Sequence, residues 1–209
     1  EYTEQATSDA IKFYVNLQNN DWCPTQEQFA NTSATEQFFS GQGAMFFAGN
    51  WDLVNLCSTY TDMNGKWDVA VLPKCPNPES GDGRAVISNS VSYATAAEGK
   101  NKDTAMDFLK FLASEEGQKI QGESGVAIPA YNGLEDTWVN TFAEKGYDIH
   151  PENIIPMFDY SVKYVNNPSR PSWEPKVEQA VLDIYAGNTS VDDGIQNMQN
   201  IVTEAIAEE

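Results

Sequence analysis

Trp51 lies between two polar side chains, directly after a short apolar run bracketed by glycines. The stretch reads FFSGQGAMFFAGNWDLVNL over residues 38–56, so Asn50 precedes the indole and Asp52 follows it. The face of an indole can stack on the C–H face of a sugar ring, while amide and carboxylate groups exchange hydrogen bonds with the hydroxyls. These residues predict a carbohydrate-binding site. The alternative is that Trp51 is a core residue that packs a helix onto a sheet.

Groups for covalent or metal chemistry are sparse. The one histidine, His150, precedes Pro151 in a loop, and the sequence has no G-x-S-x-G, H-E-x-x-H or phosphate-loop motif. GQGAMF begins like a dinucleotide fingerprint, but Phe46 takes the place of the third glycine. Neighbouring carboxylates arise by chance among 31 acidic residues. We therefore predict no catalytic residue, no bound metal and no cofactor.

The charge balance argues against several partners. Twelve basic and 31 acidic residues give a formal net charge of −19, so the field of the chain repels nucleic-acid phosphates and anionic lipid headgroups. No apolar run approaches the roughly 20 residues that a membrane-spanning helix needs. We predict no nucleic-acid partner and no direct membrane insertion in this segment.

The three cysteines, Cys23, Cys57 and Cys75, lack the spacing of metal ligands. Because their number is odd, at least one is free or has its partner outside these residues. We expect structural or unpaired thiols. A disulfide between Cys57 and Cys75 is the alternative in an oxidising compartment.

Apolar periodicity and capping residues predict alternating helices and strands, and hence an α/β fold. Asn50 and Ser172 are expected helix caps, and Ser190 with Asp193 has the spacing of a capping box. The expected helices span about 8–19, 35–40, 51–58, 103–113, 134–144, 173–186 and 191–207. The expected strands span 44–48 and 67–72. Residues 85–95 are expected as a strand pair or one long bent strand, and 154–158 as a short strand or extended connector.

Five blocks of sequence resemble, in the same order, the C-terminal half of the family 1 extracellular solute-binding proteins. These are the maltose-binding-protein-like sugar receptors of ABC transporters. The blocks are FFSGQGAMFFAGNWDL, WDVAVLP, ISNSVSYATAAEGKNKDTAMDFLKFLASEEGQ, GVAIPAY and VLDIYAGNTSVDDGIQNM. The resemblance covers about residues 8–207.

The resemblance implies a type II periplasmic-binding-protein-like fold, in which two α/β lobes joined by a hinge enclose an oligosaccharide. It implies delivery of that ligand to the membrane permease of an ABC transporter. It also implies an extracytoplasmic location, as a cell-surface lipoprotein or a periplasmic protein. The chain would then be incomplete, with residues 1–73 and 126–209 in the C-terminal lobe. Residues 74–125 would pack with an N-terminal lobe outside this chain.

The same resemblance implies a set of ligand-binding residues. It places Trp51 in the cleft, and it suggests Trp173 as a second stacking residue with Arg170 as its polar partner. Packing or capping is the alternative for Trp173. Residues 88–90 would lie at a strand tip turned towards the ligand. The full predicted set is Asn50, Trp51, Asp52, Ser88, Asn89, Ser90, Arg170 and Trp173.

Two other classes of function stay open at this stage. A carbohydrate-active enzyme or lectin module could use the same tryptophans, but an enzyme would need two carboxyl groups at a fixed separation. A binding protein for a non-sugar solute is the other alternative. The remaining tryptophans, Trp22, Trp67 and Trp138, are expected in core or surface packing.

Overall fold

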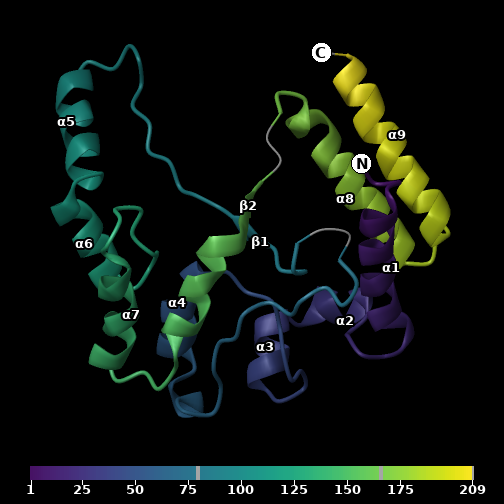
Figure 1. The fold of residues 1–209 in the computed structure, drawn as a ribbon, viewed down its shortest axis with the longest axis horizontal. Helices are drawn as coiled ribbons and strands as arrows, with labels where there is room; N and C mark the ends of the chain where they lie inside the picture. Colours follow the sequence, from purple (N-terminus) through teal and green to yellow (C-terminus); the bar gives the residue numbers. More distant parts are fainter. Residues whose placement is uncertain (79–80, 165–166, 209) are drawn as a thin grey trace. The chain divides into compact units, whose positions relative to one another are not determined.

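The structure, a computed structural model, describes residues 1–78, 81–164 and 167–208 (Figure 1). The chain divides into two compact units. The first contains the described part of 1–46, 76–83 and 165–209, and the second contains 47–75 and 84–164. Each unit has a hydrophobic cluster of its own.

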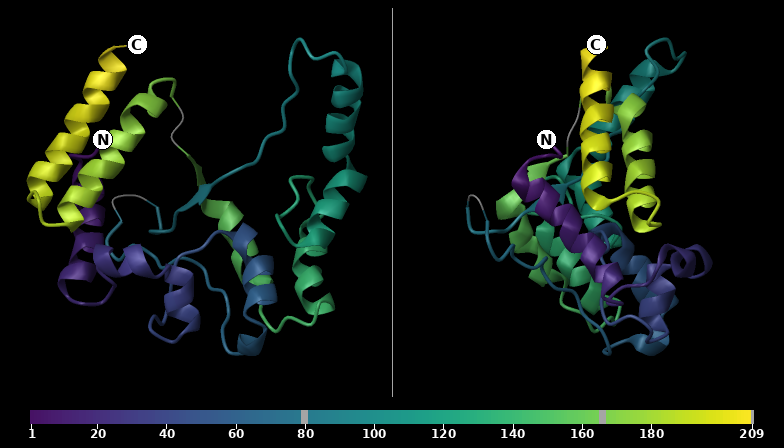
Figure 2. Two further views of the ribbon diagram at one scale, coloured as in Figure 1. Left: turned by 180° about the vertical axis from the view of Figure 1, so that it is seen from behind. Right: turned by 90° about the vertical axis from the view of Figure 1, so that its right-hand side faces the viewer.

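Three long helices form the core of the first unit. In Figures 1 and 2, α1 (Gln5–Asn19), α8 (Arg170–Tyr185) and α9 (Val191–Ala207) lie against one another. Burying their apolar faces provides the main stabilisation of this unit. The buried cluster consists of Val15, Trp173, Val177, Ala180, Ile184, Ile195, Met198 and Ala205.

Local capping fixes several helix starts in this unit. The short helices α2 (Gln26–Asn31) and α3 (Ala34–Phe39) each begin with a capping box. Helix α9 begins after Ser190, whose hydroxyl accepts a hydrogen bond from the Asp193 amide at 3.1 Å, as the sequence predicted. These bonds satisfy backbone donors that have no partner inside the helix.

The second unit is also mainly helical. It contains α4 (Leu53–Thr59), α5 (Lys102–Leu112), α6 (Glu115–Ser124) and α7 (Glu135–Glu144), of which α6 and α7 pack side by side (Figure 1). Three 3-10 segments are η1 (Asn50–Asp52), η2 (Thr61–Met63) and η3 (Pro151–Tyr160). The buried cluster consists of Leu53, Cys57, Trp138, Phe142 and Ile149.

The sheet found in the described residues consists of one short pair of parallel strands. Strand β1 (Val86–Ser88) pairs with β2 (Ser161–Lys163), and the two lie side by side in Figure 1. Val86 lies opposite Ser161. Helices dominate the described residues, and this parallel pair is the strand component that they contribute to the predicted α/β class.

The strands predicted at 44–48 and 67–72 are wrong. Neither segment is a strand here, because a strand needs a neighbouring strand to accept and donate its backbone hydrogen bonds. The apolar composition of the first segment suggested a buried strand, but Met45 is 89% exposed. In the second segment, the Val69 carbonyl accepts a hydrogen bond from the Asn153 side chain instead.

Several element limits also differ from the prediction. The strand expected at 85–95 shortens to β1, and the segment at 154–158 lies in η3 instead of being extended. Gly49, not Asn50, is the N-cap of η1, and Ser169, not Ser172, is the N-cap of α8. Helix α2 was missed because its start is marked by capping residues with little apolar periodicity.

The lobe boundaries predicted at 73 and 126 stay a prediction. They describe packing against residues outside this chain, and residues 79–80, 165–166 and 209 within the predicted segments lie outside the described part. Within the structure, α5 and α7 fall in the same compact unit. Across the described ranges, no helix combines the length and apolarity needed to cross a membrane.

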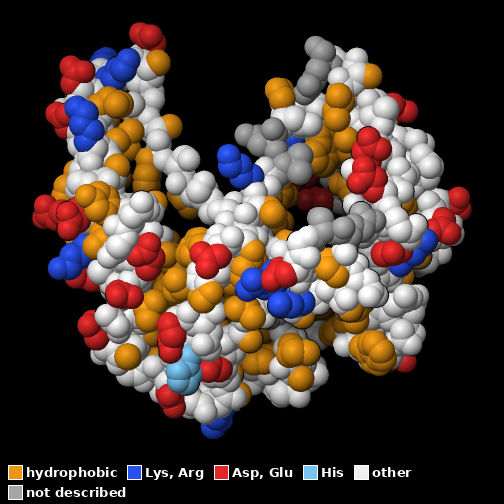
Figure 3. Space-filling model, in the orientation of Figure 1, with side chains coloured by type: hydrophobic (Ala, Val, Ile, Leu, Met, Phe, Trp, Pro, Cys, Tyr) orange, Lys and Arg blue, Asp and Glu red, His pale blue; other side chains and the backbone are white. Residues whose placement is uncertain are grey.

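Helix α5 presents apolar side chains to solvent. None of its residues is buried, and Met106, Phe108 and Phe111 are all exposed. Figure 3 shows apolar side chains at the surface over this part of the molecule. An exposed apolar face of this kind commonly marks a surface for association.

Candidate functional site

The Trp51 side chain projects from a turn that is fixed to the core of the second unit. Gly49 caps η1, and its carbonyl accepts a hydrogen bond from the Asp52 amide at 3.1 Å. The turn continues into α4, whose Leu53 and Cys57 are buried in the hydrophobic cluster. The turn is therefore held at one end by packed side chains.

The indole itself is accessible. Trp51 is 47% exposed, while Asn50 and Asp52 on either side are half-buried. A ring with this exposure is not the fully buried core residue considered as the alternative. It presents an aromatic surface beside an amide and a carboxylate, the combination that a hydroxylated ring requires. Its role in ligand binding stays a prediction.

Trp173 lies in a different environment, in the first unit. It is 7% exposed, belongs to the cluster between α1, α8 and α9, and donates from Nε1 to Asn167 Oδ1 at 3.2 Å. Arg170 pairs with Glu174, with Nη2 and Oε1 separated by 2.6 Å. This burial favours the packing alternative for Trp173, because little of its ring is open to a ligand.

Residues 88–90 belong to the second unit, as Trp51 does. Ser88 ends β1 opposite Lys163, and Asn89 and Ser90 follow it; all three are exposed. Their hydroxyl and amide groups are accessible to a ligand. The other three tryptophans lie as expected: Trp22 is exposed on the surface, Trp67 packs against the second cluster, and Trp138 is fully buried.

A histidine–aspartate pair that the sequence did not reveal lies in the second unit. His150 Nδ1 is 2.6 Å from Asp68 Oδ2, and both side chains are partly exposed. The hydrogen bond with Asp68, the charge of Asp68 and the nearby Glu152 and Asp148 raise the pKa of His150. The pale-blue histidine lies among red acidic side chains in Figure 3.

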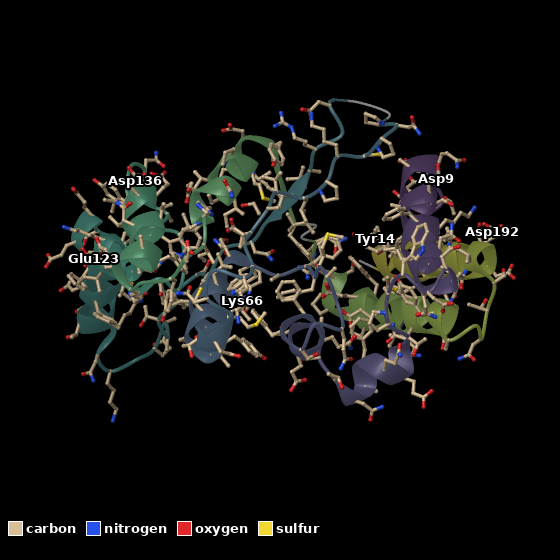
Figure 4. The ribbon with its side chains drawn as sticks, turned by 90° about the horizontal axis from the view of Figure 1, so that it is seen from below. Asp9, Tyr14, Lys66, Glu123, Asp136 and Asp192 are labelled. Atoms are coloured by element: carbon tan, nitrogen blue, oxygen red, sulfur yellow. The ribbon has the colours of Figure 1, made fainter. Side chains whose placement is uncertain are left out.

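Two shallow hollows lie elsewhere. One, of about 400 Å³, is lined by acidic and amide side chains between α6 and α7, including Glu123 and Asp136 (Figure 4). The other, of about 180 Å³, is lined by polar uncharged side chains of α2, α3 and the residues beside them. None of the eight predicted binding residues lines either hollow.

The cysteines and acidic side chains offer little reactive chemistry. Cys23, Cys57 and Cys75 are free thiols, so the structure lacks the Cys57–Cys75 disulfide. Burial raises the pKa of Cys57 to about 11, which keeps the thiol protonated. Among the described residues, no group of three or more His, Cys, Asp or Glu side chains could hold a metal ion.

Comparison with known proteins identifies related sequences and folds. The model of the family described as bacterial extracellular solute-binding protein matches residues 2–119. The crystal structure of a sugar transporter from Rhizobium etli, in an open conformation, matches with a TM-score of 0.70 at 22% identity. That match covers 97% of this chain and 52% of the other, so the chain spans about half the length of this relative. A search of curated proteins found no significant match.

Proposed function

The chain belongs to the bacterial extracellular solute-binding protein family, and from this premise we propose that it forms part of an extracytoplasmic receptor for a carbohydrate. The observation that carries the proposal is the Trp51 turn, where a 47% exposed indole lies between Asn50 and Asp52. The fold match to a sugar transporter of Rhizobium etli is in keeping with this ligand class.

Trp51 would stack on one face of a sugar ring. Asn50 would donate or accept hydrogen bonds at the hydroxyls, and the Asp52 carboxylate would accept them. Ser88, Asn89 and Ser90 would add polar contacts from the end of β1 and the residues after it. Trp173 and Arg170 are weaker members of the set, because one is buried and the other is paired with Glu174.

We place the other wall of the site in a second lobe, formed by residues outside these 209. A ligand held between two lobes is shielded from water on both sides, which strengthens each of its hydrogen bonds. The exposed apolar face of α5 is a surface on which such a lobe could pack. The loaded receptor would then deliver its ligand to an ABC transporter permease.

Calorimetry on the full-length protein tests the proposal. Maltotriose, cellotriose and xylotriose represent neutral oligosaccharides, while triglycine, spermidine and phosphate represent other solutes. We expect at least one oligosaccharide to bind, and Trp51→Ala to weaken its binding by about 1–3 kcal/mol. Trp22→Ala is the matched control, because Trp22 is a solvent-exposed tryptophan outside the predicted set.

The other classes give different results. Binding of only triglycine, spermidine or phosphate would show that the ligand is a non-sugar solute. Release of shorter sugars during incubation, lost on replacing a single carboxylate, would indicate an enzyme. Equal effects of Trp51→Ala and Trp22→Ala would remove Trp51 from the site.

A further inference from the structure

We propose that Gly49 is the positioning residue of the Trp51 indole, and that its missing side chain sets the face of the ring offered to a ligand. The second half of this inference rests on the proposed function. The first half concerns only the position of the ring and can be tested without any ligand.

The contact between the two residues is unusually close. A Cβ atom added to Gly49 would collide with Cε2, Cζ2 and Cη2 of Trp51. Because these three consecutive ring atoms are nearly equidistant from that Cβ, the glycine lies over the face of the six-membered ring and not at its edge. The indole therefore folds back onto the backbone two residues before it.

Backbone conformation does not explain the glycine. Gly49 has φ −87° and ψ 154°, an extended conformation that any residue adopts. Many other glycines of the chain have positive φ, where a side chain is strained; Gly49 does not. The close approach of the indole is thus the feature that a side chain at position 49 would disturb.

This packing has a consequence for recognition. The Gly49 backbone covers one face of the six-membered ring, yet Trp51 remains 47% exposed. A sugar would therefore stack on the opposite face. A methyl group at position 49 would force the indole into another rotamer and so change the face of the ring that is open to a ligand.

The test uses five variants of the full-length protein: the single variants Gly49→Ala, Gly43→Ala and Trp51→Ala, and the double variants Gly49→Ala/Trp51→Ala and Gly43→Ala/Trp51→Ala. Gly43 is the matched control, because a Cβ there would meet only ordinary contacts, the nearest at 3.8 Å from the Phe38 nitrogen. Subtracting the fluorescence of each Trp51→Ala protein from its parent isolates the signal of Trp51 from that of the other tryptophans. Acrylamide quenching of this difference reports the exposure of the ring.

We expect Gly49→Ala to shift the Trp51 emission and increase its quenching, whereas Gly43→Ala leaves both unchanged. In the presence of Trp51, Gly49→Ala should weaken binding of the best oligosaccharide among maltotriose, cellotriose and xylotriose by about tenfold. In the Trp51→Ala background it should have no further effect, because a positioning residue acts only through the group that it positions.

An unchanged Trp51 signal in Gly49→Ala would overturn the proposal. So would a loss of affinity that persists in the Trp51→Ala background, since Gly49 would then act independently of the ring. If none of the three sugars binds the wild type, the proposed function fails, but the fluorescence comparison still decides whether Gly49 positions Trp51.

Discussion

His150 Nδ1 lies 2.6 Å from Asp68 Oδ2, although 82 positions separate the two residues. The Asp68 carboxylate also accepts hydrogen bonds at 2.8 Å from the amides of His150 and Val69. Beside this pair, Asn64 donates to the Gly146 carbonyl and accepts from the Asp148 amide. Together these bonds fasten residues 64–69 to residues 146–150.

The two members of the pair respond to pH in opposite directions. The hydrogen bond and charge of Asp68 raise the pKa of His150 above its ordinary 6.5. Burial alone would raise the pKa of Asp68, but the hydrogen bonds from His150 and Val69 and the charge of His150 outweigh it and lower that pKa below 3.8. Both side chains are therefore charged at pH values between the lowered pKa of Asp68 and the raised pKa of His150.

We predict that this pair stabilises the protein at mildly acidic pH. Its histidine contribution is fully present below pH 6.5 and is lost as the pH rises through the raised pKa of His150. Its aspartate contribution is lost when the pH falls below 3.8. Thermal unfolding should show His150→Gln less stable than wild type at about pH 5, with the difference shrinking towards about pH 8. A difference that stays constant over this range would contradict the prediction.

A second prediction concerns the close packing of α8 and α9. A Cβ on Gly194 would collide with Cγ1 and Cδ1 of Ile184. Overpacking of this kind costs about 1–3 kcal/mol, which exceeds the gain of about 1 kcal/mol from replacing a helical glycine with alanine. Gly194→Ala should therefore lower the free energy of unfolding, measured with urea.

Two further variants separate packing from helix propensity. Asn197→Ala, at an exposed position of the same helix, should be neutral or slightly stabilising. Ile184→Val removes one of the colliding atoms and should recover part of the loss in Gly194→Ala. If both alanine variants change stability equally, the contact with Ile184 is not the cause.

The sequence predicted what local chemistry determines. Helix α9 matched its expected range of 191–207, because the Ser190 cap directly precedes the helix and the apolar periodicity lies within it. The strand predictions were less accurate, because the pairing of β1 with β2 joins segments that are far apart in the chain. The His150–Asp68 pair was invisible for the same reason.

For Trp173, the spacing of apolar residues in the sequence already indicates a buried side chain. Trp173 precedes Val177, Ala180 and Ile184 at helical spacing, and all four lie in the same buried cluster. That spacing predicts a packed ring. Trp51 lacks such a pattern, and only its neighbours Asn50 and Asp52 indicated an accessible position.

The third prediction tests these two tryptophans against each other. Trp173→Ala should lower the free energy of unfolding by about 3–5 kcal/mol, the usual cost of removing a buried aromatic side chain. Trp51→Ala should cost much less, because the ring is already 47% exposed. Urea unfolding of both variants provides the comparison. If Trp173→Ala weakens sugar binding and leaves stability unchanged, Trp173 is a stacking residue after all.

The fourth prediction concerns the exposed face of α5. Phe108 and Phe111 of this helix stack with their ring centroids 6.4 Å apart, and no residue of the helix is buried. If a second lobe covers this face in the full-length protein, the isolated 209-residue chain should associate with itself through it. Light scattering at increasing concentration should then show a rising average mass.

Phe108→Glu should suppress this association, because a carboxylate loses its hydration when an apolar contact buries it. Phe13→Glu is a demanding control, since Phe13 and Phe108 are both 59% exposed and each lies on a helix. Phe13 belongs to α1, which already buries its Val15 face against the first cluster. Equal suppression by both variants would mean that exposed apolar area in general drives the association. Suppression by Phe108→Glu alone would assign it to α5, none of whose residues is buried.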